Sequence, residues 1–216
     1  MLEIFNFNYD PIRQGYDTNT WRTLVGTPDI SASGRLLIDD GTGGSVIHYT
    51  DFVKGEVNLN VNIPSSPAAG DSRYFGMSSP NGAKYIKFSV GENLTCETAD
   101  KGNVTSSDTL EWNTDWNGVD LDFKIVWEAS RAKFYIEGVM VYEVCDDSVP
   151  YGPLSLSLFD NSNTVMTVGD MSVKGTQSIF VNPVTSDATV TVTDLDVDLN
   201  DGATVAENIS ETVVGP

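Results

Sequence analysis

Histidine and cysteine are scarce in this chain of 216 residues, and each scarcity excludes a class of function. His48 is the single histidine, so a multi-histidine zinc site and a triad that pairs a histidine with a distant serine both lose most of the residues they could use. The two cysteines, Cys96 and Cys145, are too few for a disulfide framework and show no metal-ligand spacing. Structural thiols and a single disulfide are the two interpretations that the sequence leaves open.

Basic residues are also few. The chain has 12 lysines and arginines against 31 aspartates and glutamates, a formal net charge of −19 and a pI near 4.1. A field of this sign repels phosphate backbones and anionic membrane surfaces. We therefore expect neither a nucleic acid nor a membrane among the partners. The charge indicates solubility or adaptation to salt, with cation capture as the alternative.

Long apolar runs and helical periodicity are missing as well. No stretch approaches the roughly 18 apolar residues that a membrane-spanning helix needs. No convincing window places apolar residues at positions i, i+3, i+4 and i+7. The first residues, Met1, Leu2, Glu3 and Ile4, lack the basic-then-apolar order of a signal peptide. We expect that the chain is not exported by that route, or that a leader has been removed.

Short strands are what the sequence does contain. Residues 121–158 alternate apolar and polar side chains in several runs rich in aromatic and β-branched residues, which is typical of half-buried strands. Residues 46–49 and 55–63 continue the pattern, Asn81-Gly82 predicts a hairpin, and residues 100–108 are predicted to be a polar loop. About twelve short strands with closely spaced turns indicate an all-β antiparallel sandwich.

The composition changes after Gly175. From Ser178 onward the chain has no Trp and no Tyr, and Val, Thr and Asp are frequent. We therefore predict a β-sandwich over residues 1–175 and a C-terminal β segment, a hairpin or arm, over residues 176–216. A stalk unit and an arm that docks on a neighbouring subunit are further interpretations of this segment.

Three pieces of the 121–158 stretch resemble a known family. They are Phe123-Lys124-Ile125-Val126-Trp127, Phe134-Tyr135-Ile136-Glu137-Gly138 and Pro153-Leu154-Ser155-Leu156. In this order they resemble the concanavalin A-like lectin and glucanase superfamily, especially its laminin-G-like jelly rolls. The resemblance implies a concanavalin A-like sandwich over residues 1–175. It does not imply one function, since the superfamily includes hydrolases, lectins, adhesive domains and virion proteins.

The glucanases of that superfamily resemble one another in an E-x-D-x-x-E strand, which holds a nucleophile and an acid/base close together. This chain contains no E-x-D-x-x-E, and its nearest acidic strand, Asp120-Leu121-Asp122, has neither the spacing nor the glutamates. We therefore predict that the chain is not an enzyme and assign no catalytic residue. A glycoside hydrolase with another carboxylate pair is the enzymatic alternative.

Two tryptophans with polar neighbours, in residues 112–117, form the best candidate for sugar binding. Indole rings stack on a pyranose face while amides and carboxylates bond its hydroxyls. The alternative is structural, with both rings covering an edge of the sandwich. Trp21 and Trp127, by contrast, follow the strand pattern and are predicted core residues. The candidate carbohydrate-binding residues are Trp112, Asn113, Asp115, Trp116 and Asn117.

Calcium is the cofactor candidate, because the laminin-G-like domains that the chain resembles recurrently bind it; the prediction requires no cofactor. The acidic run of residues 194–202 places oxygen ligands at alternate positions, but apolar residues fill the gaps. The alternative is an aspartate-faced strand that takes up cations loosely. The candidate calcium ligands are Asp194, Asp196, Asp198 and Asp201.

Two functions of different class follow. The first is a non-catalytic structural or adhesive module, such as a phage virion decoration, tail or fibre component or a surface-fibre protein, whose C-terminal β segment serves in assembly. Its partners would be a capsid, tail or fibre protein or further copies of the chain, on a virion or an extracellular surface. The alternative is a carbohydrate-binding, lectin-like domain that binds a glycan through residues 112–117 or the concave sheet.

Overall fold

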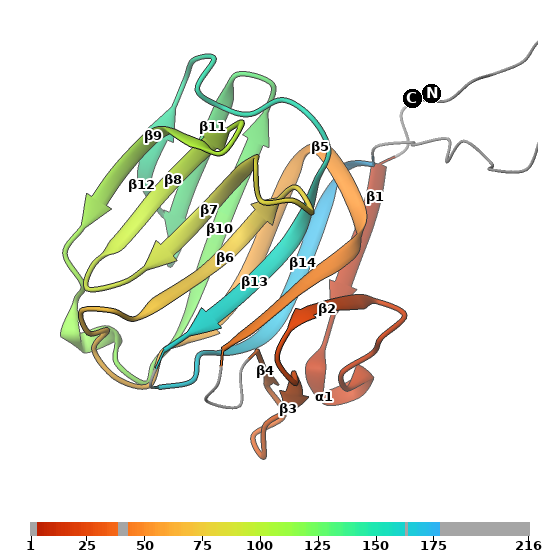
Figure 1. The fold of residues 1–216 in the computed structure, drawn as a ribbon, viewed down its shortest axis with the longest axis vertical. Coiled ribbons are helices and arrows are strands. Elements are labelled where there is room, and N and C mark those ends of the chain that lie inside the picture. The colour runs from red at the N-terminus through yellow and green to blue at the C-terminus, as the bar shows by residue number, and fades with distance from the viewer. Residues whose placement is uncertain (1–3, 39–42, 163, 178–216) are drawn as a thin grey trace, which may run out of the picture. The chain divides into compact units, whose positions relative to one another are not determined.

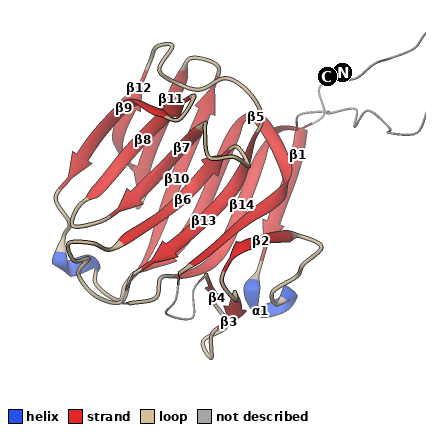
Figure 2. Cartoon of the chain, in the orientation of Figure 1, coloured by secondary structure: helices blue, strands red, loops and turns tan. Residues whose placement is uncertain are grey.

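The computed structural model describes residues 4–38, 43–162 and 164–177, which fall within the compact unit Met1–Ser178. They form an antiparallel β-sandwich in which fourteen strands belong to one hydrogen-bonded network (Figure 1). Helix in these residues is confined to α1 (Pro11–Gln14) and the 3-10 turn Thr114–Trp116 (Figure 2). The predicted all-β antiparallel sandwich is confirmed.

The strands lie in two layers (Figure 1). Alternation with period two puts apolar side chains between the layers and polar side chains on the two outer faces. The first layer runs in the order β1 (Ile4–Tyr9), β14 (Thr167–Gln177), the second half of β5 (Gly44–Asn62), β10 (Asp120–Glu128), β11 (Arg131–Ile136) and β12 (Val139–Val144).

The second layer begins at an edge strand and shares β5 with the first. Its order is β2 (Trp21–Val25), the first half of β5, β13 (Leu154–Asn161), β6 (Ser72–Ser78), β7 (Tyr85–Val90), β8 (Leu94–Asp100) and β9 (Asn103–Leu110). Two short strands, β3 (Asp29–Ile30) and β4 (Leu36–Leu37), pair with each other, and β4 also pairs with the start of β14.

β5 crosses from one layer to the other. Its residues up to Phe52 pair with β13, whereas those from Gly55 onward pair with β10 and β14. At the crossing Gly55 lies opposite Gly175, and a Cβ on Gly55 would lie 2.4 Å from the carbonyl oxygen of Lys174. Glycine is needed at this position because any side chain would overlap the facing backbone.

The core is centred on four buried phenylalanine rings. Phe75 and Phe88 come from the second layer, and Phe123 and Phe134 come from the first. The Phe75–Phe123, Phe88–Phe123 and Phe88–Phe134 ring centroids are 4.8, 5.0 and 5.2 Å apart in edge-to-face geometry. Such pairs hold the layers together through burial and aromatic contact.

Several sequence predictions are confirmed in detail. Trp21 and Trp127 are buried, and Asn81-Gly82 lies in the turn between β6 and β7. Cys96 is buried and Cys145 is exposed, and both are free thiols, so the single-disulfide alternative does not apply.

Two element predictions are wrong. Residues 46–49 and 55–62 belong to one strand, β5, which ends one residue before the predicted Ile63; the glycine at the crossing continues the ladder instead of ending it. Residues 100–108, predicted to be a loop, include most of β9, an edge strand whose residues are mostly exposed on both faces. Without a buried face, a strand shows no apolar alternation for the sequence to reveal.

The remaining predictions concern the membrane and the C-terminal segment. In the described residues no helix has the length and apolar character needed to cross a membrane. The predicted segment 176–216 lies outside the described residues, except for Thr176 and Gln177, which end β14.

Candidate functional site

An aromatic platform, formed by Tyr74, Tyr85, Lys87 and Phe159, stands on the outer face of the second layer. All four side chains are partly buried, and they come from three neighbouring strands, β13, β6 and β7. Tyr74 and Phe159 lie opposite each other, and their rings stack with centroids 4.7 Å apart and planes 10° apart. The Lys87 ammonium lies 4.3 Å from the centroid of Tyr74 and 4.0 Å from that of Tyr85. The platform is therefore a row of three rings with a cation held between two of them.

Strand alternation and one glycine build this arrangement. Alternate residues of β6 and β7 are buried in the core, so the residues between them face outward. Gly76 lies opposite Lys87, has a φ of +149°, and would place a Cβ 2.6 Å from the carbonyl oxygen of Ile86. Because no side chain occupies this position, the Lys87 side chain has room to lie over the tyrosine rings.

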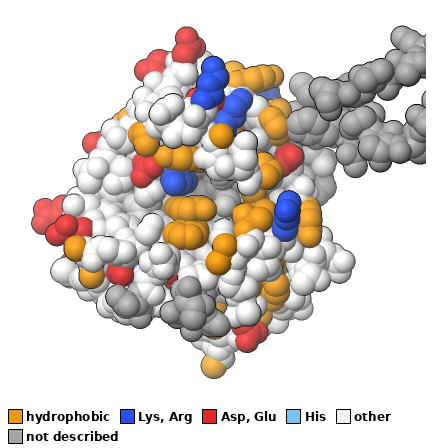
Figure 3. All heavy atoms as spheres, viewed as in Figure 1, with side chains coloured by type: hydrophobic (Ala, Val, Ile, Leu, Met, Phe, Trp, Pro, Cys, Tyr) orange, Lys and Arg blue, Asp and Glu red, His pale blue; other side chains and the backbone are white. Residues whose placement is uncertain are grey.

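Polar groups surround the platform. Glu97 on β8 lies opposite Lys87, and Ser157 on β13, which is buried, lies opposite Gly76. Burial, the charge of Glu97 and a side-chain hydrogen bond with Glu97 raise the pKa of Tyr85 to about 12, so the protonated hydroxyl donates to that carboxylate. Figure 3 shows this face, with hydrophobic side chains gathered near its middle and Lys or Arg side chains beside them. Ring surface, hydroxyls, an ammonium and a carboxylate thus lie together.

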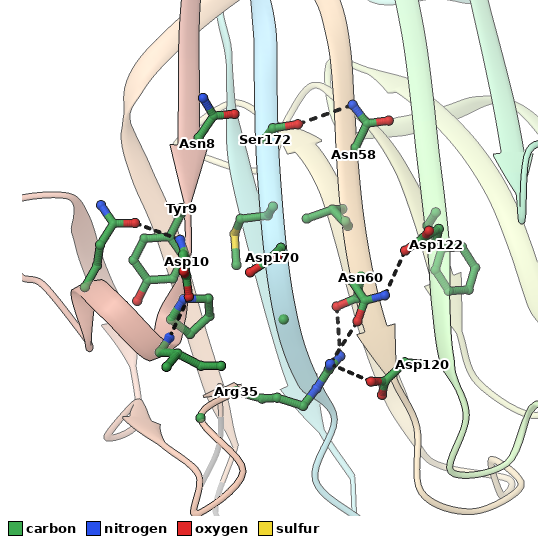
Figure 4. Close-up of a pocket in the computed structure, with 18 of the residues that line it drawn as sticks. Asn8, Tyr9, Asp10, Arg35, Asn58, Asn60, Asp120, Asp122, Asp170 and Ser172 are labelled. Carbon is green, nitrogen blue, oxygen red and sulfur yellow. Dashed lines mark hydrogen bonds and ion pairs between the residues drawn. The ribbon is translucent and has the colours of Figure 1, made fainter.

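A wide groove of about 1150 Å³ lies on the outer face of the first layer (Figure 4). Outward side chains of β5, β10 and β14 form its floor, and α1 and the turn around Gly34 flank it. The polar residues that line it are Asn8, Asp10, Arg13, Gln14, Ser33, Arg35, Asn58, Asn60, Asp120, Asp122, Lys124, Asp170 and Ser172.

The hydrogen-bond donors of this groove are largely used within it. Arg35 donates to Asn60 Oδ1 at 2.8 Å, to Asp120 Oδ2 at 3.0 Å and to Thr167 Oγ1 at 2.9 Å. Burial lowers the pKa of Arg35, and the charge of Asp120 opposes this effect. Asn60 Nδ2 in turn donates to Asp122 Oδ1 at 2.7 Å. Arg35 therefore fastens its turn to the sheet rather than reaching out to a ligand.

The other cations of the lining are also paired, Arg13 with Asp10 at 3.2 Å and Lys124 with Glu56 at 2.8 Å. The surface that remains in the groove therefore consists mainly of oxygen acceptors. Asp170 projects into it from the β-bulge where the register of β14 against β5 shifts (Figure 4). Tyr9 and Phe123 are the aromatic residues of the lining, and both are 1 % exposed. The groove thus offers carboxylate and amide oxygens but no exposed ring.

The predicted tryptophan loop is held together by its own side chains. Trp112 is buried, Trp116 is half-buried, and the two rings meet edge to face with centroids 5.4 Å apart. Trp112 Nε1 donates to Asn117 Oδ1 at 2.9 Å, and Asn113 Oδ1 accepts from the backbone N–H of Asp115 at 3.0 Å. These contacts hold the loop in place, and carbohydrate binding by its five residues stays a prediction.

Calcium binding also stays a prediction. Asp194, Asp196, Asp198 and Asp201 lie outside the described residues. Within the part of the chain that the structure describes, no group of three or more His, Cys, Asp or Glu side chains is placed to hold a metal ion.

The aromatic platform is not among the sites predicted from the sequence. Tyr74 and Phe159 are far apart in the chain, and the β6–β13 register brings them together. The available signal was an aromatic residue at an outward position of each predicted strand, which does not tell which strands are neighbours.

No protein-family model matches the chain, and no curated protein matches it. Solved structures do match. The apo Crh5 transglycosylase has a TM-score of 0.66 at 12 % identity, over 79 % of this chain and 84 % of that chain. The β-glucanase of Bacillus licheniformis has a TM-score of 0.62 at 11 % identity, over 79 % and 97 %. The carbohydrate-binding module CBM66 of Bacillus subtilis has a TM-score of 0.53 at 12 % identity, over 69 % and 92 %. At these identities the likeness shows the fold alone, and the predicted concanavalin A-like jelly roll is confirmed.

These structures correct the prediction that the chain is not an enzyme. That prediction rested on the missing E-x-D-x-x-E strand, and it is wrong as an exclusion, since a transglycosylase and a glucanase have the same fold. The absence of E-x-D-x-x-E excludes that one arrangement of catalytic carboxylates. It does not exclude catalysis by other residues. The virion role, with capsid, tail or fibre partners, stays a prediction.

Proposed function

We propose that the chain binds carbohydrate through the aromatic platform. The observation that carries the proposal is the stacked Tyr74–Phe159 pair beside Lys87 and Tyr85. A pyranose presents C–H groups on its faces and hydroxyls around its rim, so it needs ring surface together with polar groups. Both are present here, because half-buried rings keep part of their surface in water while the Lys87 ammonium and the partly buried Glu97 lie within the same rows.

The platform is a better site for a sugar than the groove on the first layer. A hydrogen bond from a sugar replaces one to water and contributes only about 0.5–1.5 kcal/mol net. Burial of apolar area adds about 25 cal/mol per Å² without that exchange. The groove supplies acceptors for the first kind of contact, but its rings, Tyr9 and Phe123, are covered.

Structural neighbours support the same class of ligand. One is a carbohydrate-binding module, and another is the Crh5 transglycosylase in complex with NAG. A binding module and an enzyme both need a surface that holds the glycan. The proposal therefore applies whether the chain only binds the glycan or also acts on it.

The test is a glycan array probed with the full chain, followed by calorimetric titration of the glycans that bind. Phe159→Ala removes half of the stack, and we expect it to weaken binding by about tenfold or more. Asn58→Ala, in the groove, is the matched control and is expected to leave the affinity unchanged. Thermal unfolding of each variant checks that it is folded.

Three results would contradict the proposal. The first is that no glycan binds. The second is that Asn58→Ala and Asp170→Asn abolish binding while Phe159→Ala does not, which would place the glycan in the groove. The third is that Trp116→Ala alone abolishes binding, which would place the glycan at the tryptophan loop.

A further inference from the structure

Lys87 is the member of the aromatic platform whose bonding is incomplete. Its ammonium lies between the rings of Tyr74 and Tyr85, at 4.3 and 4.0 Å from their centroids. Among the residues that the structure describes, it makes neither an ion pair nor a hydrogen bond. Lys124 and Lys133, on the first layer, differ in this respect, since their ammonium groups lie 2.8 and 3.5 Å from carboxylate oxygens.

The tyrosine rings hold the cation in place without using its donors. A ring face attracts an ammonium group through its quadrupole and provides no lone pair for the N–H groups. An ammonium has three donors and no acceptor. Lys87 is therefore positioned by aromatic contacts while its N–H groups are left for an oxygen that approaches from outside.

From this geometry we infer that the platform is selective for an acidic glycan, whose carboxylate or sulfate group pairs with the Lys87 ammonium while a sugar ring contacts Tyr74, Phe159 or Tyr85. The inference rests on the proposed function and names the ligand class of the same site. An anion makes charge-assisted hydrogen bonds to the ammonium, which are about twice as strong as those of a neutral hydroxyl.

Glu97 is the acidic residue that faces Lys87 on the neighbouring strand. It lies opposite Lys87 in the β7–β8 register, and no ion pair within 4.0 Å joins the two. Burial lowers the pKa of Lys87, and the charge of Glu97 opposes this effect but also repels an incoming anion. Glu97→Gln is therefore expected to strengthen the binding of an acidic glycan.

The net charge of −19 affects the rate at which an anionic ligand associates more than the interactions it makes once bound. At physiological ionic strength the Debye length is about 8 Å, so most of the acidic surface is screened from a ligand that has docked. The local pair formed with Lys87 then determines selectivity, while the distant charges slow association.

The test compares matched probes by calorimetry with the full chain. The carboxylate pair is galacturonate oligosaccharides and their methyl esters. The sulfate pair is sulfated galactan oligosaccharides and their desulfated forms. We expect the anionic member of at least one pair to bind about tenfold or more tightly than its neutral form.

Variants assign that preference to the ammonium. Lys87→Met keeps an unbranched apolar stem between the rings and should abolish the preference, whereas Lys87→Arg should retain it. Lys133→Met removes a lysine from the other layer and should leave the preference unchanged.

If both members of each pair bind equally well and Phe159→Ala weakens that binding, the inference is overturned and the proposed function stands. A preference that survives Lys87→Met would also overturn it. Absence of binding to these probes and to the whole glycan array would overturn both.

Discussion

His48 is enclosed by aromatic rings and accepts a hydrogen bond in its neutral form. Its ring centroid lies 4.0 Å from that of Phe7 and 5.5 Å from that of Trp21. Its Nδ1 accepts from the backbone N–H of Thr50 at 2.9 Å, so the proton of the neutral ring is on Nε2. Burial lowers the pKa of His48 from 6.5 to about 4. The folded state therefore resists protonation that the unfolded chain accepts readily.

This difference predicts a loss of stability in mild acid. The neutral ring stabilises the fold fully above pH 6.5, and the stabilisation is lost as the pH falls toward 4, because only the unfolded chain binds the proton in that range. The free energy of unfolding should fall by about 1 kcal/mol between pH 6 and pH 5. Urea titrations at each pH measure it. In His48→Asn, which keeps an acceptor for Thr50, this fall should disappear, and a variant that still shows it would contradict the account.

Arg73 and Asp160 form a buried ion pair beneath the aromatic platform. Arg73 directly precedes Tyr74 in the sequence, and Asp160 directly follows Phe159. Arg73 and Asp160 lie opposite each other in the β6–β13 register. Both side chains are 0 % exposed, and Arg73 Nε lies 3.5 Å from Asp160 Oδ1. Arg73 also donates to the carbonyl oxygen of Thr164 at 2.7 Å. The pair therefore fixes the register of the strands that carry Tyr74 and Phe159.

Arg73→Met should lower the free energy of unfolding by about 3–5 kcal/mol, because it leaves the Asp160 carboxylate buried without this cation. The exposed pair of Arg13 and Asp10 provides the control, since Arg13 is 87 % exposed and Arg13→Met should change stability by about 0.5 kcal/mol or less. Urea unfolding measures both variants. A loss below about 1 kcal/mol for Arg73→Met would show that the pair is not a main support.

At the scale of the elements, the crossing of β5 depends on two glycines that face each other. A Cβ on Gly55 would lie 2.8 Å from the Cα of Gly175, and a Cβ on Gly175 would lie 2.3 Å from the carbonyl oxygen of Lys54. The obstacles are backbone atoms, so relief requires the strands to move apart. Gly55→Ala should therefore destabilise the chain by about 1–3 kcal/mol.

Gly91→Ala is the matched control for the crossing. A Cβ there would have the carbonyl oxygen of Asp71 as its nearest neighbour at 3.4 Å, which is ordinary contact. Thermal unfolding of the two variants should show a lower Tm for Gly55→Ala alone. Equal Tm values would mean that the crossing tolerates a side chain.

Strands with one buried face were predictable because their apolar residues alternate, as in β10 and β11. β9 was not predictable, since its residues are mostly exposed. The joining of residues 46–49 to 55–62 in one strand was not predictable either, since a glycine in a sequence more often indicates a turn. The sequence thus predicts which side of a strand is buried. It does not predict which strands are neighbours.

At the scale of the whole molecule, the same limit explains why the candidate site was not found from the sequence. The Trp112 to Trp116 loop was visible because its aromatic and polar residues are contiguous. The aromatic platform was not, because Phe159 joins Tyr74 only through strand order and register. The two outer faces also differ: on one, stacked rings and a lysine between two tyrosines form a platform, and on the other, carboxylate and amide oxygens line a groove whose lysine, Lys124, is paired with Glu56.

The most direct test of carbohydrate binding through the aromatic platform is amide chemical-shift mapping of the isotope-labelled chain during titration with a glycan that binds. We predict that the largest changes occur at Tyr74, Gly76, Lys87 and Ser157, which lie in neighbouring positions on β6, β7 and β13. Changes concentrated instead at Asn58, Asn60 and Asp170 would contradict the account, because they would place the glycan on the opposite layer.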